Sequence, residues 1–320
     1  MGDDDPEVWG MSRFQRRWSP WQPFKLWAQA LRVHYLSASL IPVLLGMVIA
    51  RNETTIAGWR FFLVLAGVFS YHGGANLLND FYDEETDRLN RQPSLFNGGS
   101  RVLVKRLLPA KQLKRAALLC YTTGTVCALG LALSGGGVGV ALFALAGLGG
   151  GYFYSAPPLC LAATGFGELC VGLVFGPFLV AGTAVALTGR FIPTALLVSL
   201  PVGILIAAVI LTNELPDCES DRQTGKRTLV VRLGRERSIL LLAFLLVLAF
   251  CLLFMIGMGL GAPRSWAGLL LAWPMVFWLW SQRRGGLKQG SRFVMTSAGV
   301  ILLHMASGLM LIMTLIRRGS

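Results

Sequence analysis

The sequence predicts an all-α protein that crosses a membrane several times. Of its 320 residues, 54% are hydrophobic and only 14% are charged, whereas roughly a quarter of the residues in a soluble domain are charged. The mean hydropathy is +0.60. The apolar residues also form long blocks without charge, and about 20 such residues span a bilayer as a helix. Because lipid offers the backbone no hydrogen bonds, these blocks must be helical.

About nine blocks approach the length of one crossing. They cover residues 31–50, 59–78, 116–134, 137–156, 166–188, 192–212, 238–260, 266–281 and 293–316. The segment before them, residues 1–28, carries Trp18 and Trp21 beside several arginines, which suits the headgroup region and predicts a cytoplasmic or interfacial tail. The first block lacks a small-residue cleavage site, so we expect no removed signal peptide. Residues 29–320 are predicted to form a single transmembrane domain.

The distribution of positive charge predicts the orientation. If the N-terminus is cytoplasmic, four inward-facing regions hold 23 of the 29 lysines and arginines. These regions are residues 1–32, 80–115, 213–237 and 282–292. An excess of this kind is the positive-inside pattern of membrane proteins. The net charge of +13 therefore reflects topology, and we expect no nucleic-acid partner. The cysteines form no CxxC pair and the histidines are far apart, so neither a disulfide framework nor a histidine metal site is expected.

The acidic residues concentrate in two windows of similar sequence. Asn79–Asp87 reads NDFYDEETD and Asn213–Asp221 reads NELPDCESD, and both fit the pattern N-x-x-x-D-x-x-x-D. Together they hold nine of the sixteen acidic residues. Each begins where a predicted span ends, in the long cytoplasmic loops 80–115 and 213–237, and long loops in a compact protein are often functional. The recurrence predicts two related halves that face one site.

The spacing of the windows predicts a magnesium–diphosphate site. Residues four apart lie on one face of a helix, so each window presents one amide and two carboxylates together. Clustered carboxylates repel one another unless a cation neutralises them. Mg²⁺ prefers oxygen ligands and is commonly held by carboxylates together with substrate phosphates. Metal ions bridged to a diphosphate would stabilise the charge that develops as an allylic C–O bond breaks.

The site residues predicted on this basis fall into three groups. The predicted metal ligands are Asp80, Asp83, Asp87, Asn213, Asp217 and Asp221, of which Asp83, Asp87, Asp217 and Asp221 are also assigned to catalysis. The predicted contacts of the diphosphate are Asn79, Arg32, Arg101, Lys226 and Arg227. Solvent-facing positions are expected for Glu84, Glu85, Glu214 and Glu219. Glu168 is an isolated acid at the edge of a predicted span, which leaves a functional role and a helix-capping role open.

Several motifs resemble the UbiA superfamily of intramembrane aromatic prenyltransferases. Besides the two windows they are GKRTLVVRLG (225–234), LRVHYLSASLIPVLLG (31–46), YSAPP (154–158) and GFGELCVGLVFGP (165–177). The resemblance runs from Arg32 to the last span. It implies about nine helices around a central cavity, capped by the acidic loops and open sideways to lipid for an isoprenoid tail. It also implies that Tyr154 is catalytic and stabilises an allyl cation through its ring face; an interfacial tyrosine is the alternative.

The acceptor is suggested by further features of the resemblance. NGGSR (97–101), YSAPP and GFGEL are similar to the 1,4-dihydroxy-2-naphthoate branch, whereas RLNRQPSLFNGGSR after Asp87 departs from the 4-hydroxybenzoate pattern. The resemblance thus implies Mg²⁺-dependent transfer from a polyprenyl diphosphate to an aromatic quinone precursor. We expect 1,4-dihydroxy-2-naphthoate and menaquinone synthesis, with 4-hydroxybenzoate and ubiquinone synthesis as the alternative. The family also implies a bacterial inner membrane, with the active site facing the cytoplasm.

Two other protein classes stay open at this point. An ion-coupled transporter would also combine internal repeats with membrane carboxylates, although the acidic residues here lie beyond the predicted spans. A CDP-alcohol phosphatidyltransferase is likewise a magnesium enzyme of the membrane, but its D-G-x-x-A-R continuation does not occur in this sequence.

Overall fold

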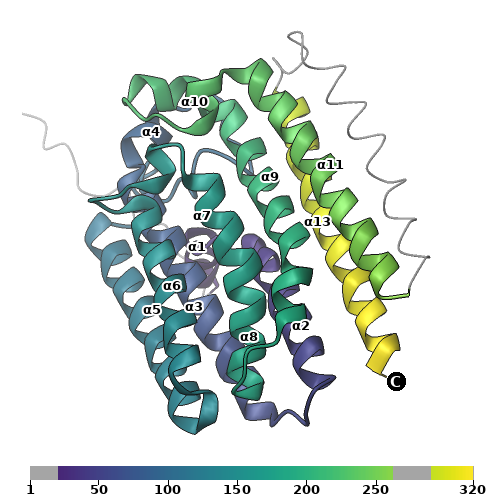
Figure 1. Ribbon diagram of the computed structural model, residues 1–320. Coiled ribbons are helices and arrows are strands. Elements are labelled where there is room, and N and C mark those ends of the chain that lie inside the picture. Colours follow the sequence, from purple (N-terminus) through teal and green to yellow (C-terminus); the bar gives the residue numbers. More distant parts are fainter. Residues whose placement is uncertain (1–20, 262–289, 320) are drawn as a thin grey trace, which may run out of the picture.

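Helices make up almost all of the structure, a computed structural model that describes residues 21–261 and 290–319. No strand occurs within those two ranges. The long helices run side by side in a bundle, and shorter helices gather at one end of it (Figure 1). The predicted all-α class is therefore confirmed.

Seven helical stretches within these ranges are long and apolar enough to cross a bilayer. Their elements are α2 (Leu36–Arg51), α3 (Gly58–Tyr82), α5 (Ala110–Leu131) with α6 (Gly137–Ser155), α7 (Gly167–Leu173) with α8 (Leu179–Thr188), α9 (Pro193–Gln223), α11 (Arg235–Gly259) and α13 (Gly290–Gly319). The shorter helices are α1 (Gln22–Ala30), α4 (Glu84–Leu89) and α10 (Leu229–Leu233). The predicted span 266–281 lies outside the described residues, as do residues 1–20 of the predicted tail.

The stretch Ala110–Ser155 contains two of the predicted spans. A π-turn at Ala132–Gly136 joins α5 to α6, and Gly135 within it has a φ of 108°. Only glycine adopts this conformation without strain. The chain bends back at this turn, so α5 and α6 lie beside each other (Figure 1). On its outer side α5 exposes Leu118, Leu119 and Val126, as expected for a helix that faces lipid.

The second acidic window is helical, as its four-residue spacing assumes, although the segment 213–237 around it is predicted as a loop. Residues 213–221 form the last part of α9, which continues to Gln223 and has Pro216 in its interior. Proline normally ends or kinks a helix. Here the helix continues because Leu215 and Cys218 are buried in the largest apolar cluster, which also holds side chains of α2, α11 and α13. Much of the predicted loop 213–237 is therefore helical.

Helix α9 occupies the centre of the packing. It contacts α7, α11 and α13, and α3 packs along α5. The contact between α7 and α9 depends on glycine, because a Cβ atom added at Gly203 would lie 2.4 Å from the carbonyl oxygen of Gly172. Small residues of this kind let helices approach closely in lipid. The close approach brings the start of α7 beside the end of α9.

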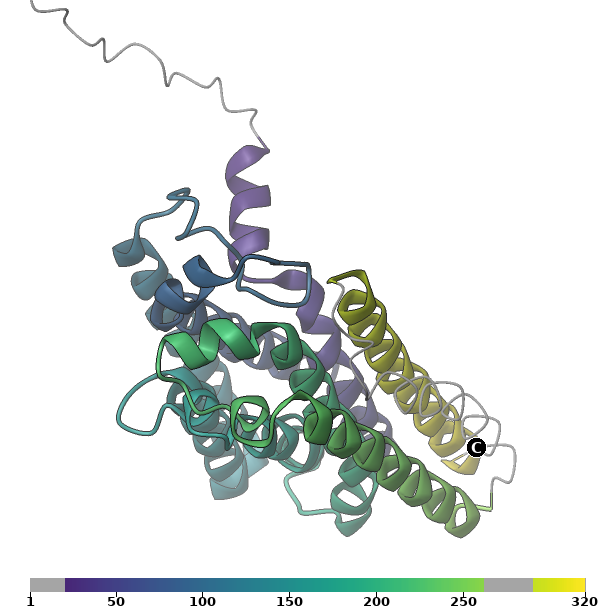
Figure 2. The ribbon, with the colours of Figure 1, turned by 90° about the horizontal axis from the view of Figure 1, so that it is seen from above.

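The two segments that carry the acidic windows cover the same end of the bundle. Figure 1 shows α4 and α10 there, and Figure 2, seen from above, shows the two segments beside each other. The hydroxyl oxygens of Thr86 and Thr224 are 3.0 Å apart and join them. The main-chain N–H of Arg227 also donates to the carbonyl of Ala163 at 2.8 Å. Segments that are distant from one another in the chain thus form one cap.

Candidate active site

A cavity of about 590 Å³ opens at the capped end of the bundle. Both acidic windows contribute to its wall, each through the asparagine and the two aspartates of its pattern. The six side chains are Asn79, Asp83, Asp87, Asn213, Asp217 and Asp221. The structure therefore brings together the residues that the spacing predicted to share one site.

The first window keeps its shared face although its helix is interrupted. α3 ends at Tyr82 and α4 begins at Glu84, with Asp83 between them. The helical hydrogen bonds continue across this break, because the N–H of Asp83 donates to Asn79 O at 2.9 Å and that of Asp87 to Asp83 O at 2.8 Å. The Asn79 side chain also donates to Asp83 Oδ2 at 2.7 Å.

Lys226 connects the two windows electrostatically. Its Nζ atom lies 2.7 Å from Asp83 Oδ1 and 3.7 Å from Asp221 Oδ1. The lysine is turned inward by its own main chain, whose N–H donates to Asp221 O at 2.9 Å. Burial alone would lower the pKa of Lys226, but Asp83 and Asp221 outweigh burial and raise it above the usual value. The ammonium group is thus held charged between the two halves.

The segment between the windows folds over the second one and holds Asp217. Asn90 and Asn97 donate to Asp217 Oδ1 at 2.6 and 2.9 Å, and the N–H of Gly98 donates to Oδ2 at 3.3 Å. Asp217 therefore has a fixed orientation. The sequence pattern alone gave no sign of Asn90 or Asn97 as neighbours of the second window.

Asp80 differs from its predicted role as a metal ligand. It is buried, does not belong to the cavity lining, and forms an ion pair with Arg32. Its other contacts are with Ser100, whose N–H donates to Asp80 Oδ1 at 3.0 Å and whose hydroxyl donates to Oδ2. One residue from Asn79 is a rotation of 100° on a helix, which turns Asp80 away from the cavity. We therefore assign Asp80 the role of holding Arg32 and the segment around Ser100.

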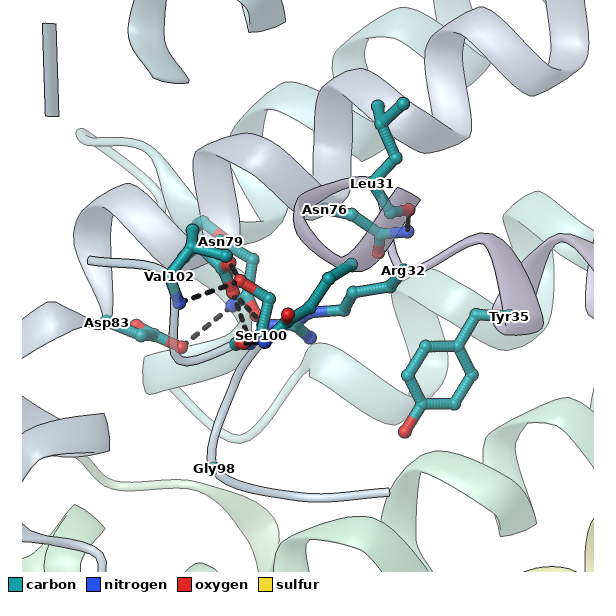
Figure 3. Close-up of polar contacts among 12 residues, drawn as sticks. Leu31, Arg32, Tyr35, Asn76, Asn79, Asp83, Gly98, Ser100 and Val102 are labelled. Carbon is teal, nitrogen blue, oxygen red and sulfur yellow. Dashed lines mark hydrogen bonds and ion pairs between the residues drawn. The ribbon is translucent and has the colours of Figure 1, made fainter. Parts of the chain in front are cut away.

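Arg32 and Arg101 present cationic side chains to the cavity. Figure 3 shows Arg32 extending from the segment after α1 toward Ser100, near Asn79. Arg101 donates through Nη1 to the main-chain carbonyl of Asp87. Both arginines line the cavity, and both have a left-handed backbone, with φ of 50° for Arg32 and 65° for Arg101. This conformation costs energy for any residue except glycine and is typical of functional sites. The Nε atom of each is buried without a hydrogen-bond acceptor, as expected of donors that await an anion.

The remaining predicted residues divide between the cavity and the surface. Tyr154 and Asn213 line the cavity, and Asn213 Nδ2 lies 3.5 Å from the Tyr35 hydroxyl. Arg227 is exposed and takes no part in the lining, so its predicted contact with the diphosphate is not supported. The reason is the turn after α9, which directs Lys226 inward and the next side chain outward.

Glu214 departs from the prediction that it faces solvent. It lines the cavity and lies beside Glu168, which is only 5% exposed at the start of α7. The helical spacing of the second window turns Glu214 off the main face, but the cavity extends around that side of α9. The isolated position of Glu168 in the sequence was the one signal for this part of the site.

A match to the UbiA prenyltransferase family covers residues 39–309, most of the chain. The chain belongs to this family. It is 31% identical over 243 residues to the 1,4-dihydroxy-2-naphthoate octaprenyltransferase of Bacillus subtilis (strain 168), with 75% of this chain and 76% of that protein covered. It is also 31% identical over 291 residues to UbiA prenyltransferase domain-containing protein 1 of Homo sapiens, with 89% and 81% covered.

The UbiA fold is also evident from a solved structure, a UbiA homolog from Archaeoglobus fulgidus bound to GPP and Mg²⁺. The two structures align with a TM-score of 0.65 at 19% identity over 90% of this chain and 99% of that chain. The chain is therefore a multi-pass membrane prenyltransferase. The alternative prediction of an ion-coupled transporter is therefore wrong, and the family match agrees with the rejection of a phosphatidyltransferase.

The acidic side chains of this UbiA-family cavity suit a divalent cation whose coordination shell is completed by the substrate. Burial, together with Asp83, Asp80 and Asp217, raises the pKa of Asp87 to about 7 although Arg32 opposes the rise, so the carboxylate lacks sufficient positive charge around it. In the described part of the chain, no three acidic, histidine or cysteine side chains converge on one point. Mg²⁺ commonly takes only one or two carboxylates and completes its shell with water and phosphate oxygens. The residues therefore fit Mg²⁺ that enters with a diphosphate.

Gly99 provides a test of the geometry around Asp87. Its φ is 69°, and an added Cβ atom would lie 1.8 Å from Asp87 Oδ2. We expect Gly99→Ala to displace this carboxylate and to lower kcat/KM by about tenfold to a hundredfold. Gly234→Ala is the matched control, because Gly234 has a φ of 76° and no atom within 4 Å of an added Cβ. Steady-state kinetics should separate the two variants although both lose similar thermal stability; equal activity would contradict the geometry.

Proposed function

We propose that this prenyltransferase transfers a polyprenyl group from a polyprenyl diphosphate to the ring of 1,4-dihydroxy-2-naphthoate, with Mg²⁺ as cofactor, in menaquinone biosynthesis. The observation that supports it most directly is the pair of acidic windows on one cavity wall, linked by Lys226. Two carboxylate sets that face each other across a cation suit a diphosphate between them. A bundle that spans the membrane supplies an apolar surrounding for the isoprenoid tail.

The donor's diphosphate is proposed to lie among Lys226, Arg32 and Arg101. These residues bind and orient it, and the unpartnered Nε atoms of the two arginines supply further donors. As the allylic C–O bond breaks, its electron pair leaves with the diphosphate. Mg²⁺ held by Asp83, Asp87, Asp217 and Asp221 would neutralise the charge that accumulates on those oxygens. The positive side chains need not move for this, which is the advantage of a preorganised site.

The acceptor in the proposed reaction is an electron-rich aromatic ring. A ring carbon attacks the allyl cation, and the ring regains aromaticity by losing a proton or, from a naphthoate, CO₂. Tyr154 lines the cavity wall, where the face of its ring can stabilise the cation before the attack. The Bacillus subtilis relative bears the name of a naphthoate enzyme, which favours this acceptor over 4-hydroxybenzoate.

The proposed orientation places the cavity at the cytoplasmic face of a bacterial inner membrane. The cavity lies at the end of the bundle formed by residues 80–115 and 213–237, the two regions richest in lysine and arginine. Positively charged loops remain preferentially on the cytoplasmic side. Mg²⁺ and a soluble aromatic acid would reach the cavity from there, and the isoprenoid tail would enter from the bilayer.

The proposed function is tested by product analysis. Purified protein with Mg²⁺ and a polyprenyl diphosphate is incubated with either 1,4-dihydroxy-2-naphthoate or 4-hydroxybenzoate. We expect pyrophosphate release and a prenylated product only with the naphthoate, and we expect both to disappear on chelation of Mg²⁺. A prenylated benzoate as the main product would replace the proposed acceptor, and turnover in the absence of divalent cations would contradict the proposed cofactor.

A second cavity offers room for the donor's tail. It measures about 140 Å³, is lined mainly by apolar residues of α3, α5, α6 and α8, and shares His72 and Phe175 with the main cavity. An apolar chain attached to a diphosphate in the main cavity would extend into it. The proposed path runs between α3 and α6, where several glycines line the wall.

This path predicts how one substitution changes the choice of donor. Gly147 lines the second cavity, and the nearest atom to an added Cβ there is a ring carbon of Tyr71 at 4.0 Å, so a side chain can start at this position without a clash. We expect its kcat/KM to fall about tenfold for long polyprenyl diphosphates and to change little for geranyl diphosphate, because the leucine fills the path. Gly149→Leu is the control, since Gly149 lines neither cavity and has open space beside it. Equal donor preferences in both variants would place the tail elsewhere.

A further inference from the structure

Two carboxyl groups meet beside the main cavity, and neither is used by the proposed diphosphate site. Glu168 from α7 is 5% exposed, and both of its carboxyl oxygens are buried without a hydrogen-bond partner in the described part of the chain. The carboxyl group of Glu214 from α9 is its acidic neighbour. Glu214 lines the cavity, and its Oε2 atom is likewise buried and unpartnered. Buried polar atoms normally have partners, so each exception requires an explanation.

The fold holds this pair in place. The close approach at Gly203 fixes α7 against α9, and Glu168 lies in the first turn of α7. An added Cβ atom at the neighbouring Gly167 would lie 3.5 Å from the Tyr154 ring and 3.7 Å from Glu214 Oε1. Glu214 and the ring of Tyr154 therefore lie together on the cavity wall, and Glu168 lies beside them outside the lining. These three side chains form a group distinct from the one around Lys226, whose ammonium contacts Asp83 and Asp221.

The unpartnered atoms of this group are all hydrogen-bond acceptors. They are Glu168 Oε1, Glu168 Oε2, Glu214 Oε2 and, one residue before Glu214, Asn213 Oδ1. Oxygen atoms of this kind bind O–H or N–H donors. A diphosphate carries no such donors when ionised. A ring that carries phenolic hydroxyl groups offers the donors that these atoms lack.

We infer that Glu214 and Asn213, with Glu168 behind Glu214, form a subsite that binds the hydroxyl groups of the aromatic acceptor. This inference rests on the proposed function. In it, the enzyme recognises the acceptor through its hydroxyl groups and not through its carboxylate. Glu214 contacts the acceptor, and Glu168 is a positioning residue that orients Glu214. With the hydroxyls bound there, the aromatic ring lies next to Tyr154, on the side of the cavity where the allyl cation is proposed to form.

The test compares acceptor and donor kinetics in matched variants of the full chain. In Glu214→Gln and Glu168→Gln we expect the KM for 1,4-dihydroxy-2-naphthoate to rise about tenfold, the effect of losing one hydrogen bond in a buried site. The KM for the polyprenyl diphosphate should remain within about twofold, which also shows that the cavity is folded. Glu219→Gln is the control, because Glu219 lies in the same window but is exposed and contacts Arg222 and Gln223; it should match the unaltered enzyme.

A competing ligand separates recognition of hydroxyl groups from a general effect on the site. 2-Naphthoate has the ring and the carboxylate but no hydroxyl group, so its inhibition constant should be the same in the unaltered enzyme and in both variants. The subsite would be overturned if the acceptor KM were the same in the variants and the unaltered enzyme. It would also be overturned if the variants changed the magnesium requirement and not the acceptor KM. Either result would leave the proposed function intact. Absence of transfer to any aromatic acceptor by the unaltered enzyme would overturn both.

Discussion

Asp217→Asn should reduce prenyl transfer by about a thousandfold, because it removes one negative charge from the proposed metal–diphosphate site. The substituted amide keeps an oxygen that accepts from Asn90 and Asn97 and loses only the longer bond from Gly98 N–H to Oδ2, at 3.3 Å, so the fold should be preserved. The charge that holds a divalent cation is lost all the same. Asp83→Asn is expected to act similarly from the other half of the cavity. The loss should be seen both as pyrophosphate release and as prenylated product.

The control for these variants lies in the same window. Glu219 is exposed, so Glu219→Gln removes one negative charge from α9 without altering the cavity and should keep full activity. Thermal unfolding of all three variants in detergent should occur near that of the unaltered protein. Normal turnover in both aspartate variants would exclude the proposed assignment of the metal ligands, whereas loss in the Glu219 variant would point to a general effect of charge.

Lys226→Met is the second substitution with a large expected effect. The methionine keeps the apolar part of the side chain but removes the ammonium that lies between Asp83 and Asp221. We expect kcat/KM for the polyprenyl diphosphate to fall about a hundredfold, since a buried cation that binds a leaving group contributes on this scale. The acceptor's KM should change little. Kinetics with varied donor and saturating acceptor measure the effect.

Arg227→Met is the matched control for Lys226. It removes the same unit of charge one residue later in the chain, from a side chain that is exposed and outside the cavity lining. We expect at most about a twofold change, because exposed charges contribute little. Equal losses in the two variants would show that the net charge of the segment matters and that the inward position of Lys226 does not.

The contrast between Lys226 and Arg227 shows the limit of the sequence pattern. Adjacent basic residues after an acidic window were both predicted to contact the diphosphate, and the chain directs only one of them inward. The same limit applies to Asp80 and Glu214, whose predicted roles were reversed. The helical period places Asp80 off the main face, and its position in the acidic window alone led to the prediction that it binds the metal. Glu214 is off that face too, but the cavity wraps around α9 to reach it.

The sequence by itself determined the membrane class, all the spans that the structure describes, and the six window residues that share one cavity. These features depend on local composition and on helical spacing, because lipid requires long apolar helices and a period of 3.6 residues sets which side chains lie together. Only the tertiary structure decided which of the other charged groups face the cavity. That choice depends on contacts between distant segments: the turn at Asn90–Gly98 that holds Asp217, the ion pair that takes Asp80 from the cavity, and the glycine contact that brings Glu168 to Glu214. No spacing within one window encodes such contacts, since they arise when separate helices pack.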